Sequence, residues 1–221
     1  MKKDAMPAPL FCILSGISGI VGVILIIVSF TINVGPPQDA TTAQLSAFAG
    51  ENYNSILWGA WLQAVGPVFI VLFAFSLIYM AGFTKRIAGW MAFFGAGILM
   101  TVSLIEITFY IGVLFKQPAG VVPIIMDLIN AAQHLYFIVA APAFFIPLGI
   151  IILSSKVLPG VLGYLAIMLG ITFAVLGITT LLKLVIPPLI TAFGGFQGLW
   201  WLSASITFIA RAKKVPYPAI E

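Results

Sequence analysis

The sequence predicts an all-α, polytopic membrane protein: a six-transmembrane-helix bundle with both termini in the cytoplasm. The 221 residues are 62% hydrophobic and 7% charged, with a mean hydropathy of +1.19. A soluble domain carries about 25% charged residues, so this chain has too few polar side chains to cover a water-soluble globule. Six apolar runs are each long enough to cross roughly 30 Å of hydrocarbon as a helix. They are continuous, whereas the strands of a membrane barrel are short and alternate in polarity.

The six predicted spans belong to a single domain, residues 1–221. We expect the first span to remain uncleaved, because its apolar run is about twice as long as the core of a signal peptide. Prolines at 36–37, 118, 159 and 187–188 mark the ends of spans or the turns between them. The predicted spans are residues 10–34, 55–83, 88–115, 131–154, 160–185 and 189–210.

Small residues and internal prolines indicate how the spans pack. Small residues gather on one face of the first span and in the sixth span, where they permit close helix contact. These glycine-rich faces are also candidate surfaces for a homo-oligomer. Pro67 in the second span and Pro142 and Pro147 in the fourth remove backbone hydrogen bonds, so we expect kinks or carbonyls that neighbouring groups must satisfy. The small residues are Ser15, Gly16, Ser18, Gly19 and Gly22 in the first span and Gly194, Gly195 and Gly198 in the sixth.

Basic residues predict the orientation of the bundle. If both termini share one side of the membrane, eight lysines and arginines fall on that side and two on the other. The long first loop, residues 35–54, contains acidic residues and no basic one. Cytoplasmic loops carry the excess of Lys and Arg, so the sequence predicts a multi-pass protein of the bacterial inner membrane with cytoplasmic termini. The eight are Lys2, Lys3, Lys85, Arg86, Lys156, Arg211, Lys213 and Lys214, and the two are Lys116 and Lys183.

A weak internal repeat is visible in the openings of two spans. Residues 88–92 (AGWMA) open the third span and residues 162–166 (LGYLA) open the fifth, each after a proline-bearing helix and a short basic turn. An aromatic residue after a basic turn is also common in membrane hairpins. Duplication and simple interfacial anchoring therefore both stay open as interpretations.

Glu106 is the most informative residue of the chain, because it lies two-thirds of the way along the third apolar run. A carboxylate inside a membrane span is costly unless it is paired, neutral or hydrated, and such residues are functional candidates by default. With the predicted topology, Glu106 lies in the outer half of the membrane. The other polar residues that fall there or just outside are Gln63, Tyr110, Asp127, Asn130, Gln133, His134, Lys183 and Gln197.

Helical spacing suggests which of these residues meet. Asp127, Asn130 and His134 stand at i, i+3 and i+7 and share a face if the fourth helix begins early. Glu106 and Tyr110, at i and i+4, share a face as well. If the two faces meet, Glu106 and His134 form a pair that can exchange a proton. Lys183 is the alternative counter-ion for Glu106, or a residue that extends to the membrane surface.

Several chemistries are disfavoured. The single histidine excludes bis-histidine haem ligation, and the single cysteine, Cys12, excludes an intrachain disulfide. There is no metal-ligand spacing motif, no phosphate-binding glycine loop, no Gly-x-Ser-x-Gly and no Cys-x-x-Cys. The basic residues are spread over loops without exposed aromatics, which argues against nucleic-acid binding. We therefore expect no metal, no cofactor and no assigned catalytic residue.

The second half of the chain resembles a known pattern. Residues 153–164 (LSSKVLPGVLGY), the segment through Pro187, the pair Trp200 and Trp201, and Arg211 carry it. They resemble the bacterial six-span membrane proteins grouped as a domain of unknown function (the DUF-four-three-eight-six type). The resemblance covers about 131–214 and departs from the pattern at Gly160, where an arginine is usual. It implies a six-span fold and brings no activity.

Three interpretations of function follow from the sequence. The leading one is an inner-membrane protein, not an enzyme, with an outward-facing polar pocket that binds or transports a small solute or proton. Glu106 is its central residue, with His134, Tyr110 and Gln63 as partners. The full set of candidate residues is Glu106, His134, Tyr110, Gln63, Asn130, Asp127, Lys183 and Gln197. The second is an intramembrane enzyme on a lipid or quinone-like substrate, with Glu106 and His134 as an acid–base pair. The third is a scaffold or assembly partner whose polar groups hold helices together.

Overall fold

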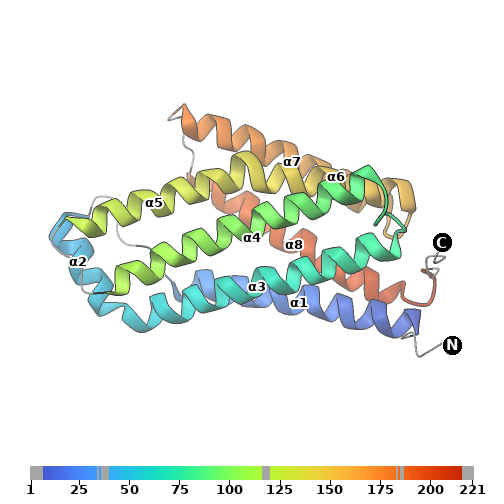
Figure 1. The fold of residues 1–221 in the computed structure, drawn as a ribbon, viewed down its shortest axis with the longest axis horizontal. Coiled ribbons are helices and arrows are strands. Elements are labelled where there is room, and N and C mark those ends of the chain that lie inside the picture. The colour runs from blue at the N-terminus through green and yellow to red at the C-terminus, as the bar shows by residue number, and fades with distance from the viewer. Residues whose placement is uncertain are drawn as a thin grey trace.

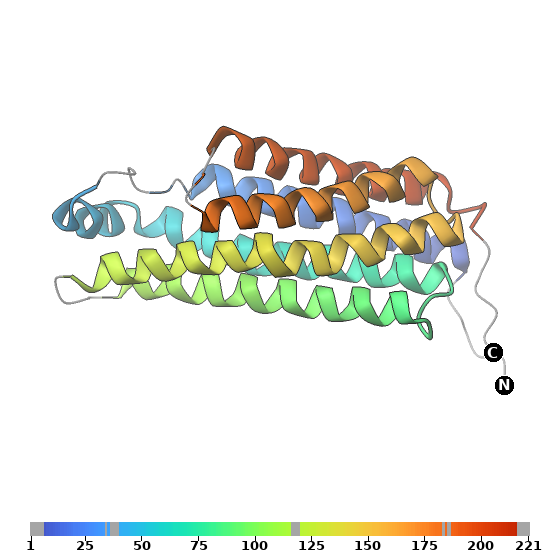
Figure 2. The ribbon, with the colours of Figure 1, turned by 90° about the horizontal axis from the view of Figure 1, so that it is seen from above.

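The computed structural model describes residues 7–33, 35, 40–115, 120–182, 184 and 187–215, and every regular element in this part of the chain is a helix. The long helices run side by side as an elongated bundle, in which α1 begins and α8 ends at the same end (Figures 1 and 2). The elements are α1 (Ala8–Ile32), α2 (Thr42–Glu51), α3 (Tyr53–Met80), α4 (Ile87–Leu114), α5 (Val121–Leu135), the π-helix η1 (Tyr136–Ala140), α6 (Ala141–Ser155), α7 (Gly160–Leu181) and α8 (Pro187–Ala210).

Within the described residues, five helices are long and apolar enough to cross a membrane. They are α1, α3, α4, α7 and the continuous helix Val121–Ser155, which α5, η1 and α6 form together. These helices indicate an integral membrane protein, as the composition predicted. The sixth predicted span corresponds to α8, which is 24 residues long. Its glycines, two tryptophans and Gln197 make it less hydrophobic than the other long helices. Its role as a span therefore stays a prediction.

Two elements differ from the sequence-based prediction. Residues 35–54 were expected to be a loop, but they contain α2, which begins with a capping box in which Thr41 and Gln44 satisfy each other's backbone N–H groups. The fourth span begins at Val121 and not near residue 131, after Gly120 turns the chain with a φ of 92°. The early start places ten further residues, including Asp127 and Asn130, on a helix.

The fourth span stays continuous through Pro142 because the helix widens before it. Pro142 has no N–H to bond the carbonyl four residues earlier, and η1, at 136–140, lies immediately before α6. There the backbone N–H of Ala141 bonds the carbonyl of Tyr136, five residues back. A π-helical turn of this kind accommodates the missing bond without ending the helix.

Close backbone contact at small residues holds the bundle together. A Cβ added to Gly22 of α1 would lie 2.7 Å from the carbonyl oxygen of Gly66 on α3. Ser29 Oγ donates to the Gly59 carbonyl of α3 at 2.7 Å. The small-residue face predicted for the first span is thus confirmed as a packing face. By contrast, nothing lies within 4 Å of a Cβ added to Gly194, Gly195 or Gly198, so a homo-oligomer through that face stays a prediction.

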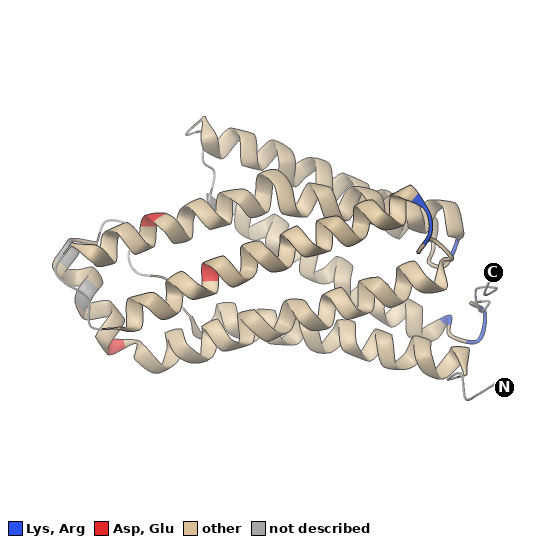
Figure 3. Cartoon of the chain, in the orientation of Figure 1, with Lys and Arg blue, Asp and Glu red and all other residues tan. Residues whose placement is uncertain are grey.

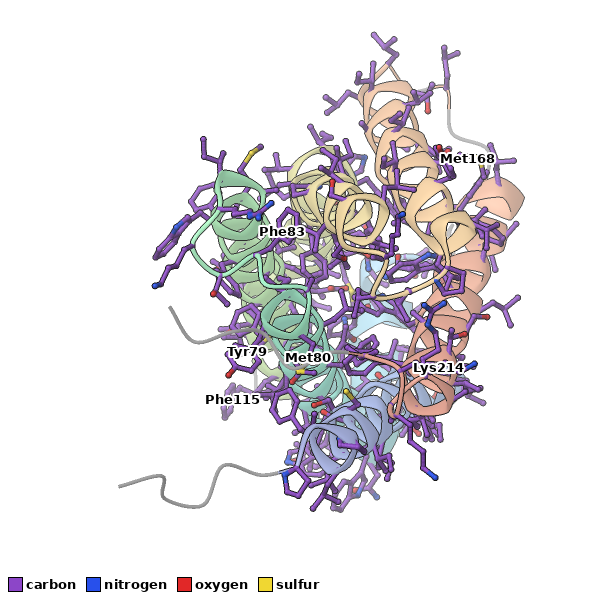
Figure 4. All side chains as sticks on the ribbon, turned by 90° about the vertical axis from the view of Figure 1, so that its right-hand side faces the viewer. Tyr79, Met80, Phe83, Phe115, Met168 and Lys214 are labelled. Carbon is purple, nitrogen blue, oxygen red and sulfur yellow. The ribbon has the colours of Figure 1, made fainter. Side chains whose placement is uncertain are left out.

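An aromatic core fills the half of the bundle in which α1 begins and α8 ends. Phe73, Phe144, Phe145 and Trp201 are fully buried there and meet ring to ring. Trp200 donates its indole N–H to the carbonyl of Leu162 at 2.9 Å, which ties α8 to α7. Figure 4 looks onto this end and shows side chains filling the space between the helices. The core is therefore well packed at this end.

Charge is divided along the length of the bundle. The described basic residues lie at the end where α1 begins and α8 ends, and the described acidic residues lie toward the other end (Figure 3). This separation agrees with the loop charges from which the orientation was predicted. Lys2, Lys3, Lys116, Lys183 and Asp39 lie outside the described residues.

Two glycines on α4 offer a matched test of this packing. A Cβ added to Gly95 would collide with the Ala143 carbonyl of α6, whereas nothing lies within 4 Å of one added to Gly97. Overpacking costs about 1–3 kcal/mol, so Gly95→Ala should lower the thermal unfolding temperature in detergent by several degrees relative to Gly97→Ala. Equal unfolding temperatures for the two variants would contradict the close approach of α4 and α6.

Candidate functional site

Glu106 lies on the face of α4 that packs into the bundle. The buried residues Leu99, Val102, Glu106 and Val113 follow one another at helical spacing along this face. The Glu106 side chain is 8% exposed, which makes it a buried carboxylate among apolar neighbours. The helix that the apolar sequence dictates therefore turns this acid inward.

Both oxygens of the Glu106 carboxylate accept hydrogen bonds from amides on other helices. Gln63 of α3 donates from Nε2 to Oε2 at 2.9 Å, and Gln133 of α5 donates from Nε2 to Oε1 at 2.9 Å. Gln63 is itself buried at 7% exposure, while Gln133 is partly exposed. We call Glu106, Gln63 and Gln133 the acid–amide cluster. It joins three helices through one carboxylate.

Pro67 on α3 leaves a backbone carbonyl next to this cluster without its helical hydrogen bond. Proline has no N–H to bond the carbonyl four residues earlier, which here is the carbonyl of Gln63. Ser103, one turn before Glu106 on α4, donates its Oγ to that carbonyl at 3.3 Å. The sequence predicted that internal prolines leave carbonyls for neighbours to satisfy, and at Pro67 this is confirmed. The proline thus provides a second hydrogen bond between α3 and α4 beside the carboxylate.

Tyr110 lies one helical turn beyond Glu106, as its spacing predicted. Its side chain is partly buried and packs against the small apolar cluster that α2, α4 and α5 form. Tyr110 follows Glu106 by four residues on α4, so the two side chains share a face of that helix. Tyr110 therefore belongs to the surroundings of the acid–amide cluster without a hydrogen bond to it among those described.

His134 is turned away from the partner predicted for it. Its Nδ1 lies 2.7 Å from the carbonyl of Asn130 on the same helix, so this nitrogen carries the proton and donates. Asp127, Asn130 and His134 do share a helix face, and the first two are exposed. The face of α5 that meets α4 carries Ile129, Ala132 and Gln133 instead.

The structure therefore gives Glu106 two glutamine partners: Gln63, which the sequence included among the candidate partners, and Gln133, which stands where His134 was expected. Neighbouring residues on a helix point about 100° apart, so a residue next to the correct one faces elsewhere. The sequence placed Gln133 among the outer polar residues, but it favoured His134, which shares a helix face with Asp127 and Asn130 and can exchange a proton. The usable signal was its spacing of four residues from the apolar position Ile129.

Gln197 belongs to a separate contact. Tyr136 of η1 donates its hydroxyl to Gln197 Oε1 on α8 at 2.6 Å, and the Tyr136 ring packs against Phe137 and Phe173. This bond connects the widened helix to α8. Lys183, the alternative counter-ion, lies outside the described residues.

The chemistry open to the acid–amide cluster is that of a protonatable group. Among the described residues, no group of three histidine, cysteine, aspartate or glutamate side chains is arranged to hold a metal ion. A glutamine amide offers both N–H donors and a carbonyl acceptor. It donates to an ionised carboxylate as seen here, and after rotation of its amide it accepts from a protonated one.

Comparisons of this chain with family models, curated proteins and solved structures found no match. The resemblance of residues 131–214 to the six-span proteins of unknown function thus stays an expectation.

The partner of Glu106 can be tested with two adjacent residues. Gln133→Leu leaves one oxygen of a buried carboxylate without its donor, and the loss of a hydrogen bond to a charged group costs about 1.5–3 kcal/mol. His134→Leu breaks only a local bond to the Asn130 carbonyl of its own helix, at a partly exposed position, and should cost much less. Thermal unfolding of both variants in the same detergent measures the difference. Equal losses, or a larger loss for His134→Leu, would contradict the described arrangement.

Proposed function

We propose that this integral membrane protein binds and releases a proton, alone or together with a small solute, at Glu106 in a polar site reached from the outer side. One observation carries the proposal: the buried Glu106 carboxylate has both oxygens held by neutral amides from two other helices. The described basic residues lie at the opposite end of the bundle (Figure 3). With no described basic residue near it, the carboxylate is proposed to take its charge compensation from a proton or a bound cation.

The orientation in the proposal rests on the distribution of basic residues. Lys85, Arg86, Lys156 and Arg211 lie at the end where α1 begins and α8 ends, and an excess of positive charge is typical of the cytoplasmic side. With α8 as a sixth span, an even number of crossings returns the chain to that side. We therefore propose cytoplasmic termini, residence in the bacterial inner membrane, and a Glu106 site nearer the outer face.

The amide partners suit a site that changes its protonation state. An isolated charge is costly inside the membrane, and hydrogen-bond donors reduce that cost for the ionised form. When the acid is protonated, a rotated glutamine amide accepts a hydrogen bond from the new O–H. No buried polar group therefore lacks a hydrogen-bond partner in either protonation state. Gln133 is partly exposed, and the proposed path of the proton to the buried acid passes this side chain.

A scaffold function is the second candidate, and the same hydrogen bonds favour it. The acid–amide cluster joins α3, α4 and α5, and interhelical hydrogen bonds between polar side chains stabilise membrane bundles. In a scaffold the cluster serves stability and its charge state is irrelevant. The enzyme interpretation lacks comparable support, because it needs His134 beside Glu106 and the described ring bonds Asn130 instead.

Glu106→Gln separates the two candidates. Glutamine keeps the shape but does not ionise: its oxygen accepts from one of the two neighbouring glutamines, and its NH2 group donates to the other once that amide has rotated. We expect the variant to remain folded and to lose a pH-dependent carboxyl C=O infrared band that the reconstituted wild-type protein shows. We also expect loss of proton flux driven by a membrane potential across proteoliposomes.

His134→Ala provides the control, and it should retain both the band and the flux. A wild-type protein without a Glu106-dependent carboxyl band at any pH where it stays folded would contradict the proton-binding proposal. Flux unchanged in a folded Glu106→Gln variant would contradict the transport part alone. Either result together with lowered stability would favour the scaffold.

A further inference from the structure

A hollow opens at the basic end of the bundle, far from the acid–amide cluster. It has a volume of about 400 Å³ and lies between the turn that joins α6 to α7 and the C-terminal end of α8. Its polar groups are Lys156, Arg211 and Tyr164, and apolar residues such as Leu153 and Leu158 form the rest of its wall. Figure 4 views the bundle from this end, with Lys214 of the neighbouring basic tail labelled.

Arg211 makes one hydrogen bond to a backbone carbonyl beside this hollow and has further N–H groups without an acceptor among the described residues. Its Nη2 donates to the carbonyl of Lys156 at 3.2 Å. Its Nε is buried and has no acceptor among the described residues. The guanidinium group also lines the hollow, so a ligand with acceptor oxygens placed there can accept from its remaining N–H groups.

Lys156 brings a second positive charge to the same place. It ends α6 in the left-handed conformation, with a φ of 57°, and its side chain is exposed. The described carboxylates Glu51, Glu106 and Asp127 belong to the other half of the bundle (Figure 3). Positive charge at the turn is therefore not neutralised by a described acid.

The position of the hollow favours an anion that lies at the membrane surface. Val161 and Tyr164 on the first turns of α7 are 61% and 69% exposed and continue a stripe of apolar residues down the outside of that helix. Such exposed side chains on a membrane span contact lipid. The first turn of α7, beginning at Gly160, adds the positive end of a 22-residue helix. Basic recesses between spans on the cytoplasmic side are suited to lipid phosphates.

We propose that this hollow binds a phosphate group, with Arg211 and Lys156 as its ligands. The guanidinium plane matches the oxygens of a phosphate and the lysine supplies a mobile charge. An anionic phospholipid headgroup and a free phosphate ion present the same chemistry. With a lipid, the acyl chains would lie along Val161 and Tyr164.

The experiment uses the full-length protein purified in neutral detergent and measures its thermal unfolding temperature. Phosphatidylglycerol, phosphatidylcholine and inorganic phosphate are added in separate arms. We expect phosphatidylglycerol to raise the unfolding temperature by several degrees and phosphatidylcholine to have a much smaller effect. A rise with inorganic phosphate alone would support the site and assign the free ion as its source.

Three variants assign the effect to the hollow. Arg211→Gln and Lys156→Gln should each remove the greater part of the rise, whereas Lys213→Gln, which deletes an exposed charge beside the hollow, should keep it. Lys156→Gln keeps the test decisive if Arg211→Gln is unstable, because the Lys156 side chain is exposed. No response to phosphatidylglycerol or phosphate, or an equal response in all three variants, would overturn the proposal.

Discussion

A carboxylate buried in an apolar bundle has to be matched by donors that the fold itself supplies, and Glu106 sets this requirement here. Water is scarce between the helices of a membrane protein, so an unpaired charge would cost several kcal/mol. Gln63 and Gln133 supply these donors: their side-chain amides approach the two carboxylate oxygens of Glu106 from different helices. The register of α3, α4 and α5 is thereby fixed at one level of the bundle.

The rest of the packing brings these three helices close enough for such short side chains to meet. Small residues allow α1 to contact α3, and Gly95 allows α4 to contact α6. Pro67 weakens α3 at the level of the acid, and Ser103 of α4 fills the bond that proline leaves open. Features that are unfavourable in an isolated helix therefore become contacts between helices. The arrangement favours a bundle that is rigid around Glu106.

Much of this architecture could be predicted from the sequence, because composition and periodic polarity are visible there. The helical class, the packing face of the first span and the position of Glu106 within a long apolar helix all follow from single-residue properties. The α2 helix was missed because polar residues after Pro36 and Pro37 look like a loop, although Thr41 and Gln44 have capping-box spacing. The partner of Glu106 depended on the rotation of α5, which a chain without fixed helix ends does not reveal. His134 was expected there because of its helical spacing from Asp127 and Asn130 and because an imidazole can exchange a proton, whereas the neighbouring Gln133 faces the acid.

The most direct test of the central claim is a pair of double-mutant cycles on thermal or denaturant unfolding in detergent. One cycle combines Glu106→Ala with Gln63→Ala, and the other combines Glu106→Ala with His134→Ala. Residues in contact show coupling energies of about 0.5–3 kcal/mol, and distant ones add within about 0.5 kcal/mol. The described structure predicts coupling in the first cycle and additivity in the second. Additive effects for Glu106 and Gln63, with coupling between Glu106 and His134, would contradict it.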